Sequence, residues 1–87
     1  MRKRVVAHGR VQGVFFRDST RERAQSAGVA GWVTNRPDGT VEAVFEGEDD
    51  AVEAMARWMG DGPRGAEVER TEVTDEEPEG LSGFEVS

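Results

Sequence analysis

The segment from Gly9 to Arg17, with the sequence GRVQGVFFR, places two glycines in a short stretch that ends at an arginine. Glycine allows backbone conformations with positive φ, so successive N–H groups can point into one concavity. An arginine beside such a concavity can hold an anion through charge-assisted hydrogen bonds, and a phosphate group suits both kinds of donor. These residue types therefore predict a phosphate-binding loop.

The chain has 87 residues and no cysteine, which removes disulfides, cysteine-ligated zinc and the thiol nucleophile of a cysteine phosphatase. This length predicts one domain, residues 1–87, with a single modest core. The apolar run Val5–Ala7 is too short for the hydrophobic part of a signal peptide, and no stretch is long enough to span a bilayer. A cytoplasmic protein is expected.

The chain carries 18 acidic residues against 11 lysines and arginines, a formal net charge of -7. This excess of negative charge argues against nucleic acid or an anionic membrane as a partner. It is consistent with solubility alone. It is also consistent with the acidic surface of a salt-adapted protein, since at about 1 M salt the screening length falls to about 3 Å.

The loop must be held by the elements around it. The spacing of Ser19 and Glu22 is that of a capping box, which predicts a helix that begins near Asp18 or Ser19 and ends at Gly28. Ala24 and Ala27 are expected on its buried side. The loop would then lie against the N-terminus of this helix, whose partial positive charge adds to that of the loop amides.

A second helix is expected from Asp49 or Asp50 to Met59, with its apolar residues at Val52, Met55, Ala56 and Met59. Apolar and β-branched residues predict strands at 4–8, 30–36, 41–47, 66–71 and 84–86. Val73 is out of phase with Val68, which predicts a bulge or an early end of the fourth strand. An acidic loop is expected at 75–80.

This order of elements predicts an α+β fold, the ferredoxin-like (βαββαβ) sandwich, with two helices on one face of an antiparallel sheet plus a short C-terminal strand. A right-handed crossover makes the first two strands parallel, with the third strand between them. Their C-terminal ends then lie at the same rim, roughly 10 Å apart. Asn35, at the end of the second strand, should face the phosphate-binding loop.

The segment Gly9–Arg17 together with Gly31–Gly39 (GWVTNRPDG) resembles the paired motifs of the acylphosphatase family. The likeness continues in Gly62–Arg64, Ala66–Arg70 and Gly83–Val86, and so covers nearly the whole chain. The resemblance implies a ferredoxin-like fold and hydrolysis of a carboxyl-phosphate anhydride without a metal or other cofactor. It implies that Arg17 binds the phosphate and that Asn35 positions the attacking water.

An acyl phosphate has a carboxylate leaving group, so its hydrolysis needs neither a covalent nucleophile nor a strong general acid. Positioning and charge stabilisation remain, and Arg17 and Asn35 suit these tasks. Asn35 is neutral and therefore does not repel the phosphate, as a carboxylate would. The amides expected to surround the phosphoryl oxygens are those of Val11, Gln12, Gly13, Val14, Phe15 and Phe16.

Other residues near the motifs have structural interpretations. Phe15 and Phe16 are expected to fill the core beneath the loop, and Gln12 is expected to brace the loop. A structural place is expected for His8, Trp32 and Trp58. Arg36 stands where the family often has a small hydroxyl residue; it either points to the opposite face from Asn35 or acts as a second cation for the substrate.

Two other functions are compatible with this fold. An RNA-binding sheet of the same fold is not favoured, because residues 41–48 lack basic and paired aromatic side chains. A non-catalytic anion-binding regulatory module remains open, and phosphate binding without hydrolysis would distinguish it. A small acyl phosphate is the expected partner, and the chain is expected to be a monomer.

Overall fold

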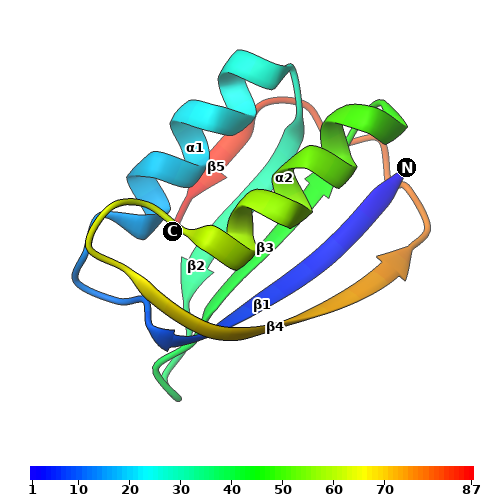
Figure 1. The fold of residues 1–87 in the computed structure, drawn as a ribbon. Helices are drawn as coiled ribbons and strands as arrows, with labels where there is room; N and C mark the ends of the chain where they lie inside the picture. Colours follow the sequence, from blue (N-terminus) through cyan, green and yellow to red (C-terminus); the bar gives the residue numbers. More distant parts are fainter.

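The computed structural model describes residues 1–87, in which two helices lie side by side on one face of a five-stranded sheet (Figure 1). This is the predicted ferredoxin-like arrangement. No helix is both long enough and apolar enough to cross a membrane. The elements are β1 (Arg2–Arg10), α1 (Phe16–Ala27), β2 (Ala30–Asn35), β3 (Val41–Glu46), α2 (Asp49–Asp61), β4 (Glu67–Glu76) and β5 (Phe84–Val86).

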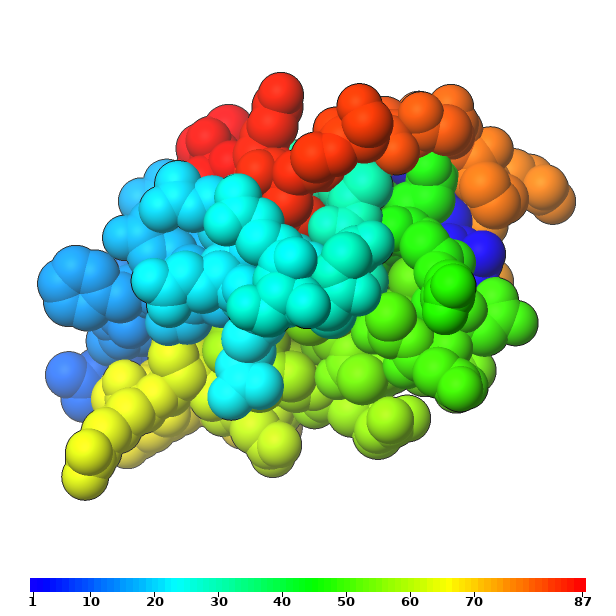
Figure 2. All heavy atoms as spheres, turned by 90° about the horizontal axis from the view of Figure 1, so that it is seen from above, coloured from blue at the N-terminus to red at the C-terminus, as the bar shows by residue number.

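The strand order across the sheet is β4-β1-β3-β2-β5. β3 lies between β1 and β2 and is antiparallel to both, so β1 and β2 are parallel, as predicted. Val41 of β3 pairs with Ala7 on one side and with Asn35 on the other, which brings the C-terminal ends of β1 and β2 to one rim. β5 pairs with β2 in parallel and makes the sheet mixed. Figure 2, which looks down on the helices, shows red β5 beside blue and cyan α1.

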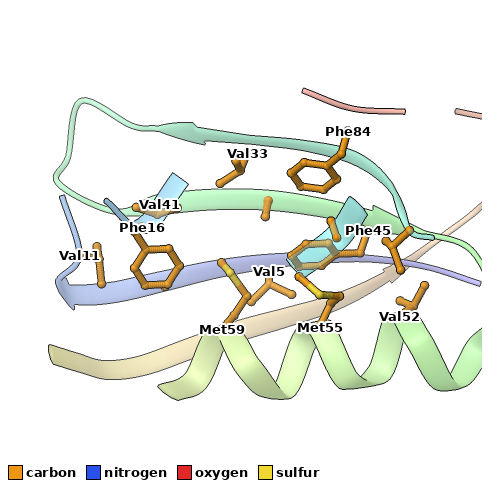
Figure 3. Close-up of a cluster of buried hydrophobic side chains, with 14 residues drawn as sticks. Val5, Val11, Phe16, Val33, Val41, Phe45, Val52, Met55, Met59 and Phe84 are labelled. Carbon is orange, nitrogen blue, oxygen red and sulfur yellow. The ribbon is translucent and has the colours of Figure 1, made fainter. Parts of the chain in front are cut away.

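The core fills the space between the helices and the sheet. Val52, Met55 and Met59 of α2 are buried, as their spacing predicts, while Ala56 is half-buried. Figure 3 shows these three side chains pointing toward Val5 of β1 and Phe45 of β3. α2 continues two residues beyond the predicted end at Met59, to Asp61, and is capped at Glu48 without a side-chain hydrogen bond.

α1 begins at Phe16, so the prediction of a capping box at Ser19 was wrong. Phe15 is the N-cap residue, has a left-handed backbone (φ 59°, ψ 27°) and makes no side-chain cap hydrogen bond. The first turn forms because Phe16 is buried there, with its ring centroid 5.6 Å from that of Trp58. This packing outweighs a local cap signal, since tertiary burial contributes most of the stability of a short helix.

The C-terminal end of α1 follows the prediction. Gly28 has φ 70° and donates its N–H to the carbonyl groups of Ala24 and Gln25, which ends the helix at a left-handed residue. Ala24 is buried, whereas Ala27 is exposed, so its prediction as a buried residue was wrong. The buried position belongs instead to Thr20, whose hydroxyl donates to the Phe16 carbonyl at 2.7 Å.

β4 contains the predicted bulge, which lies between Val68 and Val73, as their difference in phase indicated. His8 pairs with Arg70 and Gly9 with Val68, so Glu69 is the extra residue. The strand then continues past Val73 to Glu76, and only the later part of the expected acidic loop at 75–80 lies outside a strand. Gly9 is required at the bulge, because a Cβ atom there would lie 2.2 Å from the Glu67 carbonyl oxygen.

The sheet face opposite the helices carries an ion-pair cluster, which we define by Arg2, Arg4, Glu42, Glu46 and Glu76. Arg4 contacts both Glu42 and Glu76, and Arg2 donates to Glu76 at 2.9 Å. The backbone N–H groups of Glu79 and Leu81 donate to Glu46 and lower the pKa of its carboxyl group. This cluster therefore ties the segment before β5 to the sheet.

Candidate active site

The loop that joins β1 to α1, residues 11–15, has an alternating backbone. Gly13 (φ 75°) and Phe15 (φ 59°) have positive φ, whereas Gln12, Val14 and Phe16 do not. Such alternation turns neighbouring N–H groups toward one side and forms an anion-binding concavity. The loop thus has the backbone geometry that its glycines predicted, although a phenylalanine takes one of the two positive-φ positions.

The N–H groups of this loop are available to a ligand. From Val11 to Asp18, no backbone N–H donates to an oxygen atom of the protein, and the first that does is Ser19, to the Phe15 carbonyl at 3.1 Å. The run includes the first turn of α1, where N–H groups have no partner within the helix. These donors and the positive end of the helix favour an anion at the same point.

A pocket of about 320 Å³ opens at this point, which is enough for a small ligand. It brings together Arg17 and Asn35, which the sequence predicted to share a site. Val11, Gly13, Phe15 and Phe16 of the predicted loop also line it, whereas Gln12 and Val14 do not. The full lining is Val11, Gly13, Phe15, Phe16, Arg17, Asp18, Asn35 and Val86.

Arg17 is the second residue of α1 and is half-buried. Its Nη1 atom donates to the Ser87 carbonyl oxygen at 2.7 Å. This bond orients the guanidinium group, which has five N–H donors in a rigid plane and so keeps others for a ligand. Arg17 can therefore act as an oriented cation at the mouth of the N–H concavity.

Asn35 is the last residue of β2 and is half-buried. One strand separates it from the end of β1, which puts it roughly 10 Å across the rim from that strand. Its side-chain amide bonds to no protein group, so both its donor and its acceptor are free for a water molecule or a ligand.

Gln12 braces the loop, as predicted. Its Nε2 atom donates to the carbonyl oxygens of Arg36 at 2.8 Å and Thr40 at 2.9 Å, both in the β2–β3 turn. The turn is itself fixed by Asp38, which accepts from the Thr40 N–H at 3.0 Å and the Thr40 hydroxyl at 2.6 Å. These two hydrogen bonds lower the pKa of Asp38. The loop is therefore held from the side of β2.

The two adjacent phenylalanines have different environments. Phe16 is buried in the core, as predicted, but Phe15 is 79% exposed, so its prediction as a core residue was wrong. The left-handed backbone at Phe15 turns its side chain outward at the point where the helix begins. Val14 packs against the core instead.

The pocket also contains residues that the sequence interpretation missed. Asp18 follows Arg17 and lies 3.6 Å from the Arg21 guanidinium group. Val86 reaches the rim because β5 runs parallel to β2 and Val86 pairs with Val33 of that strand. The apolar alternation of residues 84–86 predicted a strand there, but it did not indicate which strand of the sheet this strand pairs with.

Other candidate groups lie elsewhere. Arg36 does not line the pocket, and its guanidinium group lies 4.0 Å from the Asp38 carboxylate. His8 contacts Glu72 on the neighbouring strand. Trp32 lies beneath the Arg4 guanidinium group at 5.4 Å, and Trp58 beneath that of Arg23 at 5.0 Å. No group of three or more His, Cys, Asp or Glu side chains is placed to hold a metal ion.

Fold and pocket together define a ferredoxin-like protein whose β1 and β2 share a rim with a pocket lined by free N–H groups and an arginine. The family model for acylphosphatase matches residues 3–86. An acylphosphatase of Rubrobacter xylanophilus is 63% identical over 87 residues, which cover 98% of this chain and 78% of that protein.

Solved structures of acylphosphatases have the same fold as this chain. An acylphosphatase from Coxiella burnetii superposes with a TM-score of 0.94 at 37% identity, over 99% of this chain and 90% of that one. For an acylphosphatase from Bacillus subtilis the TM-score is 0.93 at 34% identity, over 99% and 97% of the two chains. The chain belongs to the acylphosphatase family, as its two motifs predicted.

Proposed function

We propose that this chain hydrolyses small acyl phosphates without a metal ion, with the phosphoryl group bound by the amides of residues 11–16 and by Arg17. Asn35 positions the attacking water. The observation that carries the proposal is the pocket in which the unpaired N–H groups, the Arg17 guanidinium group and the free Asn35 amide meet. Family membership supports the reaction itself.

In the proposed reaction, a water oxygen forms a bond to phosphorus while the bond from phosphorus to the acyl oxygen breaks. The acyl oxygen leaves as a carboxylate, and the inorganic phosphate retains both protons of the water. Because the carboxylate is a weak base, it leaves without protonation. The protein stabilises the charge on the three equatorial phosphoryl oxygens, for which N–H groups and an arginine are suitable donors.

Asn35 acts on the attacking water. Its amide oxygen accepts a hydrogen bond from the water, and its NH₂ group donates to the water or to the substrate. Its place across the rim supports an in-line approach of the water. Asp18 places a carboxylate in the same pocket, and its pairing with Arg21 at 3.6 Å reduces the repulsion of a bound phosphate. Arg36 pairs with Asp38 of the β2–β3 turn and does not contact the substrate.

The test measures hydrolysis of acetyl phosphate in the presence of a chelator, with phosphate binding determined separately by calorimetry. Arg17→Ala should lose turnover and weaken phosphate binding about 30-fold or more, since a charge-assisted pair is worth roughly 2 to 5 kcal/mol. Asn35→Ala should retain phosphate binding and lose turnover. Arg57→Ala removes the same charge from an exposed position of α2 and should change neither.

Each outcome has a separate meaning. Loss of activity with the chelator would contradict the metal-free reaction. An equal loss of phosphate binding in Arg17→Ala and Asn35→Ala would mean that Asn35 is structural. Phosphate binding by the wild type without any hydrolysis would favour a regulatory module, for which the comparisons give no support.

We further propose that residues 1–87 form one domain that acts as a monomer in the cytoplasm, without a nucleic acid or membrane partner. The net charge of -7 supports the last two points. Phe15 and Val73 are the exposed large hydrophobic side chains, so no extended apolar patch favours self-association. Size-exclusion chromatography with light scattering tests the monomer.

A further inference from the structure

We propose that Phe15 binds the acyl part of the substrate and gives this enzyme a preference for apolar, ring-containing acyl groups. The inference rests on the proposed function, because it assigns the other half of the substrate whose phosphoryl half the loop amides and Arg17 hold. It concerns a side chain to which the sequence analysis gave a place in the core, and which lies instead at the pocket.

The backbone of Phe15 is unfavourable for its residue type. It is the one non-glycine residue with positive φ in the chain, at φ 59° and ψ 27°. A glycine adopts this conformation without strain, whereas a bulky side chain in it is a true outlier. Strain of this kind persists where the surrounding structure requires the conformation, and it clusters at functional sites. The N–H concavity accounts for the positive φ, but a glycine would supply it without strain, so the presence of a phenylalanine points to a function for the ring.

Packing against the rest of the chain does not explain the position of the Phe15 ring either. Phe15 is 79% exposed, the largest exposed fraction among the large hydrophobic side chains. Its neighbour Phe16 fills the core and anchors the start of α1 in its place. The blue segment that contains the loop projects at one end of the molecule in Figure 2. The ring therefore gains neither burial nor a relaxed backbone from the folded chain alone.

The pocket lining has two chemical kinds of residue. Arg17, Asn35 and the loop N–H groups are polar and match the phosphoryl group and the water, Asp18 is an acid, and Val11, Phe15, Phe16 and Val86 are apolar. An acyl phosphate with a hydrocarbon acyl group is divided in the same way, since that acyl group carries no charge. Val11 and Phe16 are buried, so Phe15 is the aromatic side chain of the lining whose ring is open to a group that extends outward from the phosphate.

The experiment compares benzoyl phosphate with acetyl phosphate for the wild type, Phe15→Gly, Phe15→Leu and Val73→Ala. In Phe15→Gly, the ratio of kcat/KM for benzoyl phosphate to that for acetyl phosphate should fall about threefold to tenfold, the range expected for one lost aromatic contact. Phe15→Leu should give an intermediate ratio. Val73→Ala shortens the other exposed apolar side chain, outside the pocket, and should leave the ratio unchanged.

Inorganic phosphate serves as the control for the loop itself, because it has no acyl group. Its inhibition constant should change less than the substrate ratio in Phe15→Gly. Phe15→Gly should also unfold at the same or a higher temperature than the wild type, since glycine relieves the strained φ.

Three results would overturn the proposal. An unchanged substrate ratio in Phe15→Gly would show that the ring does not contact the acyl group. A loss of phosphate inhibition as large as the loss for benzoyl phosphate would mean that Phe15 only shapes the loop. If the wild type hydrolyses neither substrate, the proposed function itself fails, and this inference fails with it.

Discussion

The brace formed by Gln12 makes a quantitative prediction that links stability to the site. Gln12→Ala removes the hydrogen bonds from Nε2 to the carbonyl oxygens of Arg36 and Thr40, at 2.8 and 2.9 Å. A single hydrogen bond is worth about 0.5 to 1.5 kcal/mol net. Both carbonyls keep another donor, since the Gly39 N–H bonds to Arg36 and the Arg36 N–H bonds to Thr40. The loss should therefore be about 1 to 2 kcal/mol rather than the full sum.

The assay is urea unfolding of the wild type and Gln12→Ala, combined with phosphate titration of each. The free energy of unfolding should fall by the amount above, and phosphate affinity should fall as well, because a loop that is less fixed must be ordered on binding. Gln25→Ala is the matched control on the exposed side of α1 and should change neither quantity appreciably. Weaker phosphate binding with unchanged stability would refute the reasoning, because it would mean that Gln12 contacts the anion.

Further predictions concern the core, the sheet and the charges. Met59→Ala should cost about 2 to 5 kcal/mol in urea unfolding, because Met59 is fully buried. Gly31→Ala should prevent a cooperative thermal transition, because its Cβ would lie 1.8 Å from the Val44 carbonyl oxygen. Glu46 and Glu76 have pKa values below their ordinary 4.5, owing to the Glu79 N–H and to Arg4 respectively, so their stabilisation is present above that pH and is lost below it. Melting temperatures from pH 6 to 3 check this sign. If the charge of -7 is a salt adaptation, the melting temperature should rise in molar potassium chloride, and equal stability in dilute buffer would contradict that interpretation.

The fold was predictable because its elements have strong periodic signals. The spacing of Val52, Met55 and Met59 identified the buried side of α2, and Gly28 marked the end of α1. The order of elements then left few chain topologies, since crossovers between parallel strands are right-handed. This rule predicts that Asn35 lies at the rim beside the loop, where the structure has it.

Three features depended on contacts that local patterns do not encode. The start of α1 is set by the burial of Phe16 against Trp58, which is distant in sequence. The phase of Val68 and Val73 indicated a bulge between them, but its exact place at Glu69 is set by the close approach of Gly9 to Glu67, which the phase does not encode. The partner of β5 is set by the free edge of β2, which no three-residue strand can specify.

The early start of α1 changes the chemistry of the site. A helix capped at Ser19 would have presented its unpaired N–H groups at residues 20–22, about one turn away from the loop. With its start at Phe16, the unpaired N–H groups of Arg17 and Asp18 continue those of the loop without a break. In the proposed reaction, the phosphoryl group therefore meets one continuous row of donors, with the Arg17 guanidinium group at its end. Such a row stabilises charge but supplies no atom that attacks phosphorus, so the proposed reaction uses a bound water, and we propose that the free amide of Asn35 directs this water from across the rim.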